Sequence, residues 1–415
     1  MKLFVPRETE AGETRVALSP ETAKKLAALG FEVTVESGAG ELSRIPDAAF
    51  EAAGARIGKN ASAADVVLKV RRPTQSEAKS YHKGALVIAG MDPYGNESDV
   101  AAMAAAGLSA FAMEFMPRIT RAQSMDILSS QANLAGYQAV IEGAAAFDRA
   151  LPMMMTAAGT VPAARIFVMG AGVAGLQAIA TARRLGAVVT ATDVRPAAKE
   201  QVESLGAKFI AVEDDEFRQA ETAGGYAKEM SKEYQAKQAA LVASHIAKQD
   251  IVVTTALIPG RPAPRLVSKE MLAAMAPGSV VVDLAVERGG NVEGAVSGKI
   301  AKVGSVSVVG YPNMAGRIAS TASLLYAKNL LTFLETLVDK DKKALAINMD
   351  DELVKATLLT HGGNIVHPAF ASQKPATSAG SKTAKPKATT AKTSAPKAAK
   401  PKTSAKPAAS KGESK

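Results

Sequence analysis

The 415-residue sequence is 47 % apolar, which is enough to fill the cores of two or three domains. It contains no cysteine, and this excludes disulfides, thiol nucleophiles and zinc sites built on thiolates. The net charge of +10 belongs to residues 371–415, which hold 11 lysines and one acid, whereas residues 1–370 hold 39 basic and 39 acidic residues. The neutral part therefore gives no sign of a nucleic-acid partner.

The hydropathy pattern does not suggest a secretory or membrane segment. The first residues meet a proline and several charges too early for a signal peptide. No uncharged apolar run approaches the roughly 18–20 residues that a membrane span needs. We therefore expect a soluble protein.

Residues 1–370 alternate short β-rich runs with helical patterns, which predicts parallel βαβ units. The first set of expected strands covers residues 2–5, 32–36, 65–70, 85–89 and 109–113, with helices at 21–29 and 98–106. A helical segment rich in alanine and glycine follows at 124–147 and is expected to lead into a second domain.

The second set of βαβ units is clearer. Its expected strands cover residues 165–169, 187–192, 208–211, 250–254, 280–284 and 307–309, with helices at 173–185 and 197–205. A helix at 317–337 is expected to cross back to the first domain, because the segment after it is too short to fold alone. The prediction is an α/β protein with two Rossmann-like parallel-sheet domains, a discontinuous one at 1–128 and 318–370 and a dinucleotide-binding one at 129–317.

The tail at 371–415 consists mainly of Lys, Ala, Pro, Ser and Thr. Because it cannot bury enough apolar surface to offset chain entropy, we predict that it is disordered. It can be a solubilising extension, or it can weakly hold nucleic acid or another anionic surface.

A glycine motif, G-x-G-x-x-G, follows the strand at 165–169 and opens the next helix. In such a loop the first glycine permits a tight turn, the second leaves room for a pyrophosphate, and the third lets helix and strand pack closely. Phosphates are then bound at the helix N-terminus, where free N–H groups and the dipole favour anions. The expected cofactor-binding residues here are Gly170, Gly172, Val173, Ala174 and Gly175.

The next strand ends at Asp193, which lies 18 residues after Gly175. A carboxylate at this place can accept both ribose hydroxyls of the adenosine half and would repel a 2′-phosphate, so it predicts NAD(H) rather than NADP(H). Val194 and Arg195 are expected to line the same site, and the charge of Arg195 can blur the choice. The alternative is a structural glycine turn with a surface aspartate.

Other strand ends should border the same ligand, because open α/β sheets bind ligands beyond the carboxyl ends of their strands. Thr255, Ala256 and Leu257 are assigned to the site on this ground. Asp283 can either join them or cap its own strand. A polar segment at 214–234, which contains Gly225 and Tyr226, can form a lid over the cofactor or a solvated helix and turn.

The run at 118–126, R-I-T-R-A-Q-S-M-D, is unusually polar for a domain junction. Its arginine, glutamine and aspartate side chains can hydrogen-bond a carboxamide and ribose near a nicotinamide. The arginine and aspartate side chains can equally pair with each other as structure between the domains.

Four stretches together resemble the NAD(H)-binding component of proton-translocating NAD(P) transhydrogenase, in a superfamily that includes alanine dehydrogenases. They are R-I-T-R-A-Q-S-M-D-I-L-S-S-Q-A-N-L-A-G-Y-Q at 118–138, G-A-G-V-A-G-L-Q-A-I-A-T-A at 170–182, A-T-D-V-R at 191–195 and T-T-A-L-I-P-G at 254–260. The resemblance covers roughly residues 1–370, and the tail lies outside it.

The resemblance implies that Arg118, Asp126 and Ser129 contact the NAD(H), with Arg118, Asp126 and Gln123 at the hydride-transfer site. Gln123 would reach the partner's nucleotide, and the loop around Tyr226 would close over the cofactor. It also implies a homodimer on the cytoplasmic side of a membrane subunit, and a partner subunit that binds NADP(H). Hydride would pass directly from NADH to NADP⁺, coupled to proton translocation.

The residue inventory favours this activity over an alanine dehydrogenase. Alanine dehydrogenases resemble one another in a K-V-K-E-P motif and a histidine about 20 residues later. Here the motif reads K-V-R-R-P at 69–73, with Arg71 at the lysine position, and no histidine stands at 88–92. Oxidative deamination needs a proton acceptor, whereas hydride exchange between two nicotinamides needs only positioning and water exclusion.

Two alternatives remain open from the sequence. The chain can be an alanine dehydrogenase-like oxidoreductase with a rearranged substrate site, or an NAD-sensing module whose basic tail holds nucleic acid. No metal site is expected, because His82 fits a surface turn and His245, His361 and His367 lie far apart without carboxylates at metal-site spacing.

Overall fold

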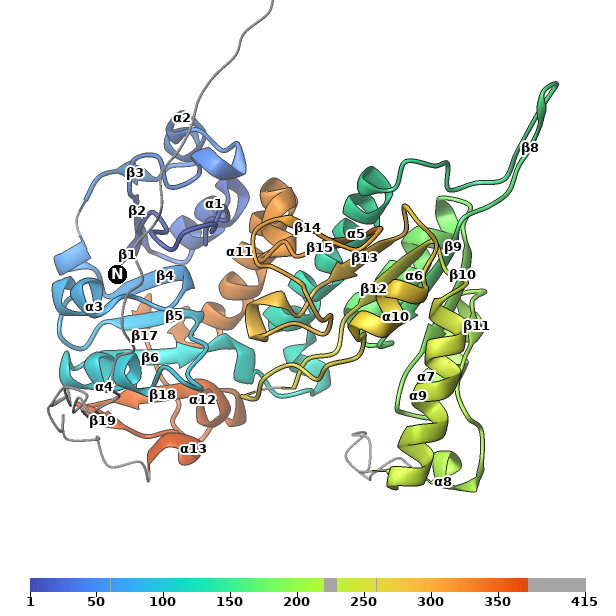
Figure 1. Ribbon diagram of the computed structural model, residues 1–415. Helices are drawn as coiled ribbons and strands as arrows, with labels where there is room; N and C mark the ends of the chain where they lie inside the picture. The colour runs from blue at the N-terminus through green and yellow to red at the C-terminus, as the bar shows by residue number, and fades with distance from the viewer. Residues whose placement is uncertain (60, 220–229, 259, 372–415) are drawn as a thin grey trace, which may run out of the picture. The chain divides into compact units, whose positions relative to one another are not determined.

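The computed structural model describes residues 1–371 except for 60, 220–229 and 259. The predicted basic tail and the predicted lid residues Gly225 and Tyr226 lie outside the described residues. In the described part, two large sheets account for most strands (Figure 1). This arrangement confirms the predicted α/β class with two parallel-sheet domains.

The first sheet has eight strands in the order β19-β18-β6-β5-β4-β1-β2-β3. Its strands are β1 Lys2–Val5, β2 Glu32–Val35, β3 Arg56–Ile57, β4 Val66–Arg71, β5 Leu86–Gly90, β6 Ser109–Ala112, β18 Leu358–His361 and β19 Asn364–Ile365. The six strands from β3 to β6 are parallel, whereas β18 and β19 extend the edge in antiparallel pairing. The sheet thus takes strands from both ends of the described chain.

The second sheet has seven strands in the order β11-β10-β9-β12-β13-β15-β14. Its strands are β9 Arg165–Met169, β10 Val188–Thr192, β11 Lys208–Phe209, β12 Ile251–Thr254, β13 Val280–Asp283, β14 Ile300–Val303 and β15 Val306–Val309. Taken in chain order, the parallel strands of each large sheet follow the sequence 3-2-1-4-5-6, which is the order of dinucleotide-binding folds. The two smaller sheets are hairpins, β7 Met154–Thr156 with β8 Gly159–Val161 and β16 Val338–Asp339 with β17 Ala344–Leu345.

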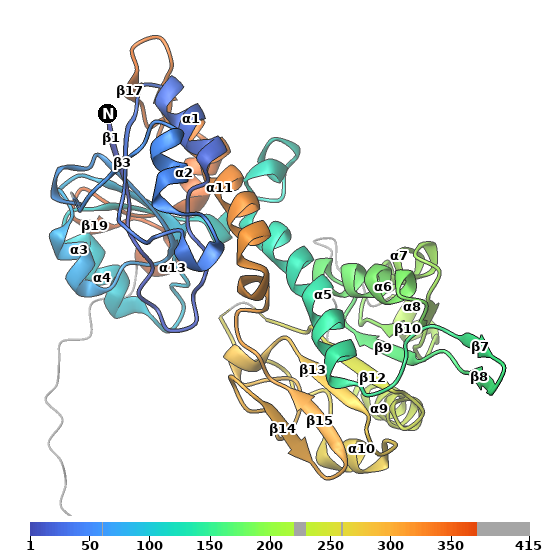
Figure 2. The ribbon, with the colours of Figure 1, turned by 90° about the horizontal axis from the view of Figure 1, so that it is seen from above.

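Helices cover both faces of each sheet (Figures 1 and 2). Around the first sheet they are α1 Pro20–Ala28, α2 Asp47–Ala52, α3 Gln75–Ser80, α4 Glu97–Ala105, α12 Glu352–Thr357 and α13 Pro368–Ala371. Around the second they are α6 Val173–Arg184, α7 Ala198–Ser204, α8 Asp215–Arg218, α9 Lys232–Ile246 and α10 Lys269–Ala274. Two long helices, α5 Ile127–Ala146 and α11 Ala319–Glu335, connect the two sheets in the sequence and pack against each other. Short 3₁₀ turns occupy η1 Glu41–Ser43, η2 Ala61–Ala63, η3 Met113–Phe115, η4 Thr120–Met125, η5 Val286–Arg288 and η6 Met314–Ile318.

The strands of the second sheet are apolar on both faces, as expected for a parallel sheet covered on both sides. In β9, Ile166 and Val168 pack in the same cluster as Ala178 and Ile179 of α6. The intervening Phe167 belongs to the opposite cluster, which includes residues of α9 and α10. Alternation along the strand therefore fixes which side chains lie on which face.

Strand register brings four carboxyl ends into one row. Met169 of β9 pairs with Thr192 of β10 and with Thr254 of β12, and Thr254 pairs in turn with Asp283 of β13. The residues that follow these strands must consequently lie side by side at one edge of the sheet.

The expected elements and the observed ones differ mainly at edges. The expected strand at 208–211 keeps two residues, and the helix expected at 317–337 starts as η6 before it becomes α11. The expected helix at 124–147 begins at Ile127, after a 3₁₀ turn. The strands β14, β18 and β19 and the hairpin β7–β8 were not predicted. The domain boundaries at 128 and 317 stay predictions.

A buried carboxylate, Glu13, ties the segment after β1 to its surroundings. Its oxygens accept the Arg15 guanidinium at 2.7 Å from both Nε and Nη2, and the Nε of Arg71 at 2.7 Å. Asn313 donates to it at 3.2 Å, and Arg15 also donates to Gln131 of α5 at 2.9 Å. Burial raises the pKa of Glu13, but the hydrogen bonds and charge of Arg15 and the charge of Arg71 outweigh it and lower the pKa to about 2.

We expect Glu13→Gln to lower the free energy of unfolding by on the order of 3 kcal/mol, because it leaves two buried guanidinium groups without their carboxylate. Since the folded pKa lies below its usual value of 4.5, the stabilisation is complete above pH 4.5 and is lost as the pH falls towards 2. Urea unfolding at pH 7 and pH 3, followed by circular dichroism, measures both effects.

Glu10→Gln is the matched control, because Glu10 is half-exposed and lies 3.7 Å from the same Arg71. Such an exposed pair contributes about 0–1 kcal/mol. Equal losses for the two variants would contradict the role assigned to Glu13.

Candidate functional site

The glycine motif forms the connection between β9 and α6. Gly170 has a φ of +105°, and a Cβ there would lie 2.4 Å from Oγ1 of Thr255. A Cβ on Gly175 would lie 1.8 Å from the carbonyl oxygen of Gly170, so both positions require glycine. Gly172 differs, because a Cβ there would meet no atom within 4 Å. The second glycine thus faces open space at the N-terminus of α6, which is the place that a pyrophosphate needs.

Asp193 follows β10 and lies directly beside this loop. Its Oδ2 accepts the backbone N–H of Ala171 at 2.7 Å, and its Oδ1 accepts that of Arg195 at 2.9 Å. The guanidinium of Arg195 bonds the same carboxylate, and the Asp193 side chain is only 7 % exposed. Val194, the remaining residue predicted here, is 61 % exposed. The structure therefore brings Asp193 and the phosphate loop together.

The loop after β12 braces the glycine loop from the other side. The Oγ1 of Thr255 donates to the carbonyl oxygen of Gly170 at 3.1 Å. Ala256 is held by Asn291, which accepts its N–H at 3.1 Å and donates to its carbonyl oxygen at 2.9 Å. Leu257 is half-exposed at the edge. Asn291 is fully buried, and sequence reasoning missed it because its partners lie 35 residues away.

Asp283 has the structural role that the sequence left open. It is fully buried, its Oδ1 accepts the N–H of Ala285 at 2.8 Å, and its Oδ2 accepts that of Val292 at 3.0 Å. Both oxygens thus stabilise the turn after β13.

The predicted nicotinamide segment forms η4 and the start of α5. Asp126 caps α5, because its Oδ1 accepts the N–H of Ser129 at 2.9 Å and its Oδ2 accepts the Ser129 hydroxyl at 2.5 Å. Arg118 and Gln123 are exposed. Arg121 pairs with Asp351 at 2.6 Å rather than with Asp126, so the pairing within the run that the sequence allowed does not form.

Helix α5 connects this segment to the phosphate loop. A Cβ on Gly136 of α5 would lie 2.0 Å from the carbonyl oxygen of Ala174, so the helix touches the first turn of α6. Seven residues separate Ser129 from Gly136, which corresponds to about 10 Å along a helix axis. The structure therefore places Asp126 and Ser129 on the same rigid helix that contacts the loop.

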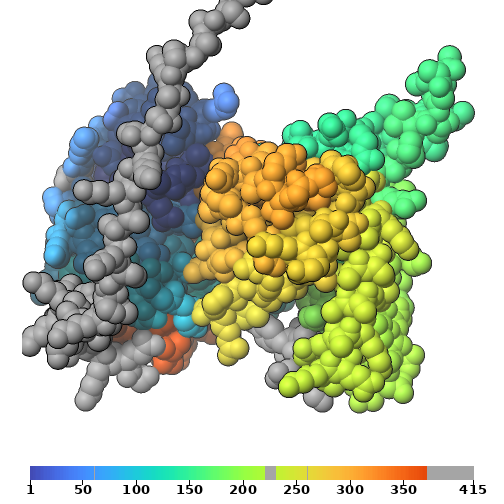
Figure 3. All heavy atoms as spheres, viewed as in Figure 1, coloured from blue at the N-terminus to red at the C-terminus, as the bar shows by residue number. Residues whose placement is uncertain are grey.

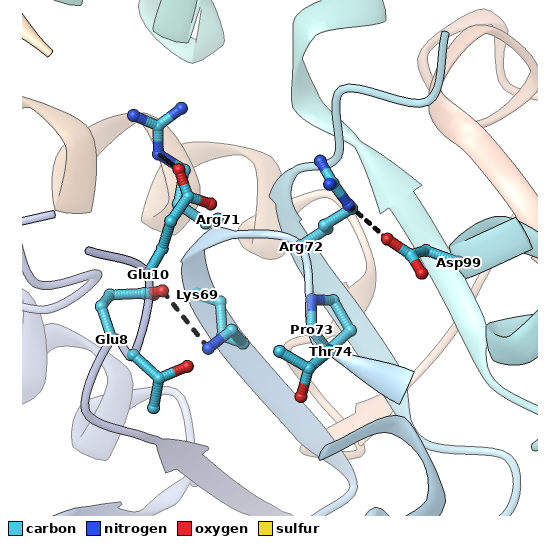
Figure 4. Close-up of a pocket in the computed structure, with 9 residues that line it drawn as sticks. Glu8, Glu10, Lys69, Arg71, Arg72, Pro73, Thr74 and Asp99 are labelled. Atoms are coloured by element: carbon cyan, nitrogen blue, oxygen red, sulfur yellow. Dashed lines mark hydrogen bonds and ion pairs between the residues drawn. The ribbon is translucent and has the colours of Figure 1, made fainter. Parts of the chain in front are cut away.

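A second polar group lies at the carboxyl edge of the first sheet (Figure 4). Glu8 follows β1, and Lys69 and Arg71 lie at the end of β4, where the strand order of this sheet reverses. Lys69 is fully buried, with its Nζ 3.3 Å from Glu8 and 3.0 Å from Glu77. Burial raises the pKa of Glu8 against the lowering effect of Lys69.

The cations of this group are already paired with carboxylates. Arg71 bonds Glu13, and Arg72 lies 2.9 Å from Asp99. Among the described residues, no cluster of three His, Asp or Glu side chains is arranged to hold a metal ion. In the same part of the chain, no helix is long and apolar enough to cross a bilayer.

Gly172→Ala is expected to fold normally, because its backbone φ of −76° suits any residue and its Cβ has room. NADH affinity should fall by about tenfold or more, since the methyl group would occupy the space of the pyrophosphate and cost at least one charge-assisted hydrogen bond. Fluorescence titration measures the affinity, and thermal unfolding checks the fold.

Gly58→Ala is the matched control, because a Cβ there makes an ordinary 3.5 Å contact with Thr34, in the first sheet's domain. NADH binding by Gly172→Ala that equals that of the unmodified chain would refute the placement of the phosphates.

Comparisons with known proteins agree with this geometry. Residues 4–135 match the family model of the alanine dehydrogenase/PNT N-terminal domain, and residues 139–368 match that of the C-terminal domain. The chain is 56 % identical over 382 residues to an NAD(P) transhydrogenase subunit alpha protein from Rhodospirillum rubrum, covering 90 % of this chain and all of that protein. It is 32 % identical to an alanine dehydrogenase from Halomonas elongata, covering 89 % of this chain and 96 % of that protein. A solved transhydrogenase structure from Sinorhizobium meliloti is 69 % identical, with a TM-score of 0.81, over 88 % of this chain and all of that one.

Proposed function

The chain belongs to the alanine dehydrogenase/PNT family of oxidoreductases, and within it we propose that this chain is the NAD(H)-binding subunit of a proton-translocating NAD(P) transhydrogenase. In this proposal it passes hydride directly to NADP⁺ that a partner subunit holds. The partner subunits also span the membrane and carry the proton step, and this chain is peripheral on the cytoplasmic face.

The observation that carries the choice of reaction is the ion pair between Arg71 and Glu13. The sequence places Arg71 where alanine dehydrogenases have a lysine, and its Nε lies 2.7 Å from the buried carboxylate. Arg15, the neighbouring cation, bonds the same Glu13. A substrate carboxylate would have to compete with an internal one for both cations. This favours hydride exchange over the oxidation of an amino acid.

The described residues fit the needs of hydride exchange. NAD(H) supplies the carbon that gives or takes the hydride, and no proton leaves that carbon, so the chain must supply position and dryness rather than an acid or base. In this proposal the loop amides near Gly172 bind the pyrophosphate, Asp193 binds the adenosine ribose, and Arg118, Asp126 and Ser129 hold the nicotinamide end. Exposed Gln123 faces the partner's nucleotide.

The proposal is tested by mixing the chain with a competent NADP(H)-binding partner and following hydride exchange between NADH and an oxidised NADP analogue. Exchange is expected only when both proteins are present. Turnover of pyruvate, ammonium and NADH by this chain alone would show an alanine dehydrogenase instead and would overturn the proposal.

In the same assay, Gln123→Ala is expected to slow hydride exchange by about tenfold to 100-fold, because a small displacement of the reacting rings has an effect of that size. The NADH affinity should stay within about twofold, since the side chain is assigned to the partner's nucleotide. Ser124→Ala, at the exposed neighbouring position, is the control and should leave the rate unchanged. A normal rate for Gln123→Ala would contradict the assigned role.

A homodimer is part of the proposal, and the β7–β8 hairpin supports it. This two-stranded hairpin projects from the rest of its domain (Figures 1 and 3), and a hairpin alone is at best marginally stable in water. Met153, Met154 and Met155 are 63 %, 42 % and 80 % exposed, and the segment at 152–163 carries no charge. An apolar, uncharged projection of this kind suits an equally apolar surface on a second copy of the chain.

Met155→Asp is expected to halve the mass measured by sedimentation while leaving the fold intact, because it places a charge in the interface at a side chain that is 80 % exposed in one chain. Met349→Asp, at a 45 % exposed methionine elsewhere, should keep the dimer. A monomeric unmodified chain, or a dimeric Met155→Asp, would refute the role of the hairpin.

A further inference from the structure

The carboxylate of Asp193 is completely hydrogen-bonded within the chain. Each of its oxygens accepts one backbone N–H, from Ala171 and Arg195 respectively. Each also accepts one guanidinium nitrogen of Arg195, with Nε 3.0 Å from Oδ1 and Nη2 3.1 Å from Oδ2. A carboxylate offers about four acceptor positions, so these four bonds use its capacity.

The two kinds of donor differ in how easily they can leave. The Ala171 amide belongs to the phosphate loop, and the Arg195 amide belongs to the turn after β10, so neither can move without deforming the backbone. The Arg195 side chain is 31 % exposed and can rotate. Its two nitrogens bind the carboxylate as a fork, side by side. Two adjacent ribose hydroxyls present the same pair of donors to the same pair of oxygens.

We propose that the Arg195 guanidinium is an internal competitor for the adenosine ribose, and that it must leave Asp193 for NAD(H) to bind. This inference rests on the proposed function, in which Asp193 accepts the ribose hydroxyls. Competition lowers the affinity and speeds the release of the cofactor. A subunit that must exchange its nucleotide after each hydride transfer gains turnover from such a device.

The inference is tested with Arg195→Met, which keeps an apolar side chain and removes the donors. Its Kd for NADH, measured by fluorescence titration, is expected to fall by about fivefold to tenfold, with a matching decrease in the release rate in stopped-flow displacement; the size is that of a partly exposed ion pair. An unchanged or higher Kd would overturn the inference, and a higher one would mean that Arg195 orients Asp193 or contacts the cofactor.

Lys199→Met is the matched control, because Lys199 forms an exposed pair with Glu213 on the adjacent helix α7. It removes the same charge from the same region and should not tighten NADH binding. Reduced nicotinamide mononucleotide, which lacks the adenosine half, should bind Arg195→Met and the unmodified chain equally. Tightening of that ligand as well would overturn the inference.

Asp193→Asn separates the inference from the proposed function. If NADH binding is insensitive to this change, the ribose assignment of the proposed function fails. If Asp193→Asn weakens NADH binding but Arg195→Met does not strengthen it, only the competition fails. In the double variant the effect of Arg195→Met should disappear, because there is no carboxylate left to contest; a persistent effect would refute the mechanism.

Discussion

The contact between α5 and the phosphate loop determines the geometry of the whole candidate site. Because a Cβ on Gly136 would lie 2.0 Å from the carbonyl oxygen of Ala174, a side chain there would push the two helices apart. Helix α5 is rigid, so the same contact sets the distance from the loop to the Asp126 cap. Ser130, in its first turn, also bonds Asn329 of α11 at 2.7 Å. A displacement at Gly136 would therefore move both ends of the proposed cofactor site.

Much of this architecture could be predicted, because it depends on local patterns. The apolar run that forms β9 and the glycine spacing after it identify the strand, the turn and the helix without any distant partner. The roles of Glu13 and Asn291 could not be predicted, because their partners lie far away in the sequence. The strand β14 was missed for the same reason: an edge strand with one neighbour carries a weak apolar pattern, and tertiary packing decides its pairing.

The two large sheets show how one strand order can serve different chemistry. In the second sheet the reversal point carries glycines, so backbone amides and open space remain for an anion. In the first sheet the same place carries Lys69 and Arg71, each neutralised by buried carboxylates. The fold alone therefore does not identify the reaction. The pairing of the side chains at the two reversal points is the more informative feature.

The methionine-rich hairpin also has a consequence for oxidative damage. Thioethers are oxidised to sulfoxides, which are polar, and a chain without cysteine has no thiol to intercept the oxidant first. Met155 and Met153 expose more of their side chains than the methionines packed in the cores, such as Met169. Peroxide would thus modify this projection before it perturbs either sheet, and mass spectrometry of the peptide around it would record the chain's exposure to oxidants.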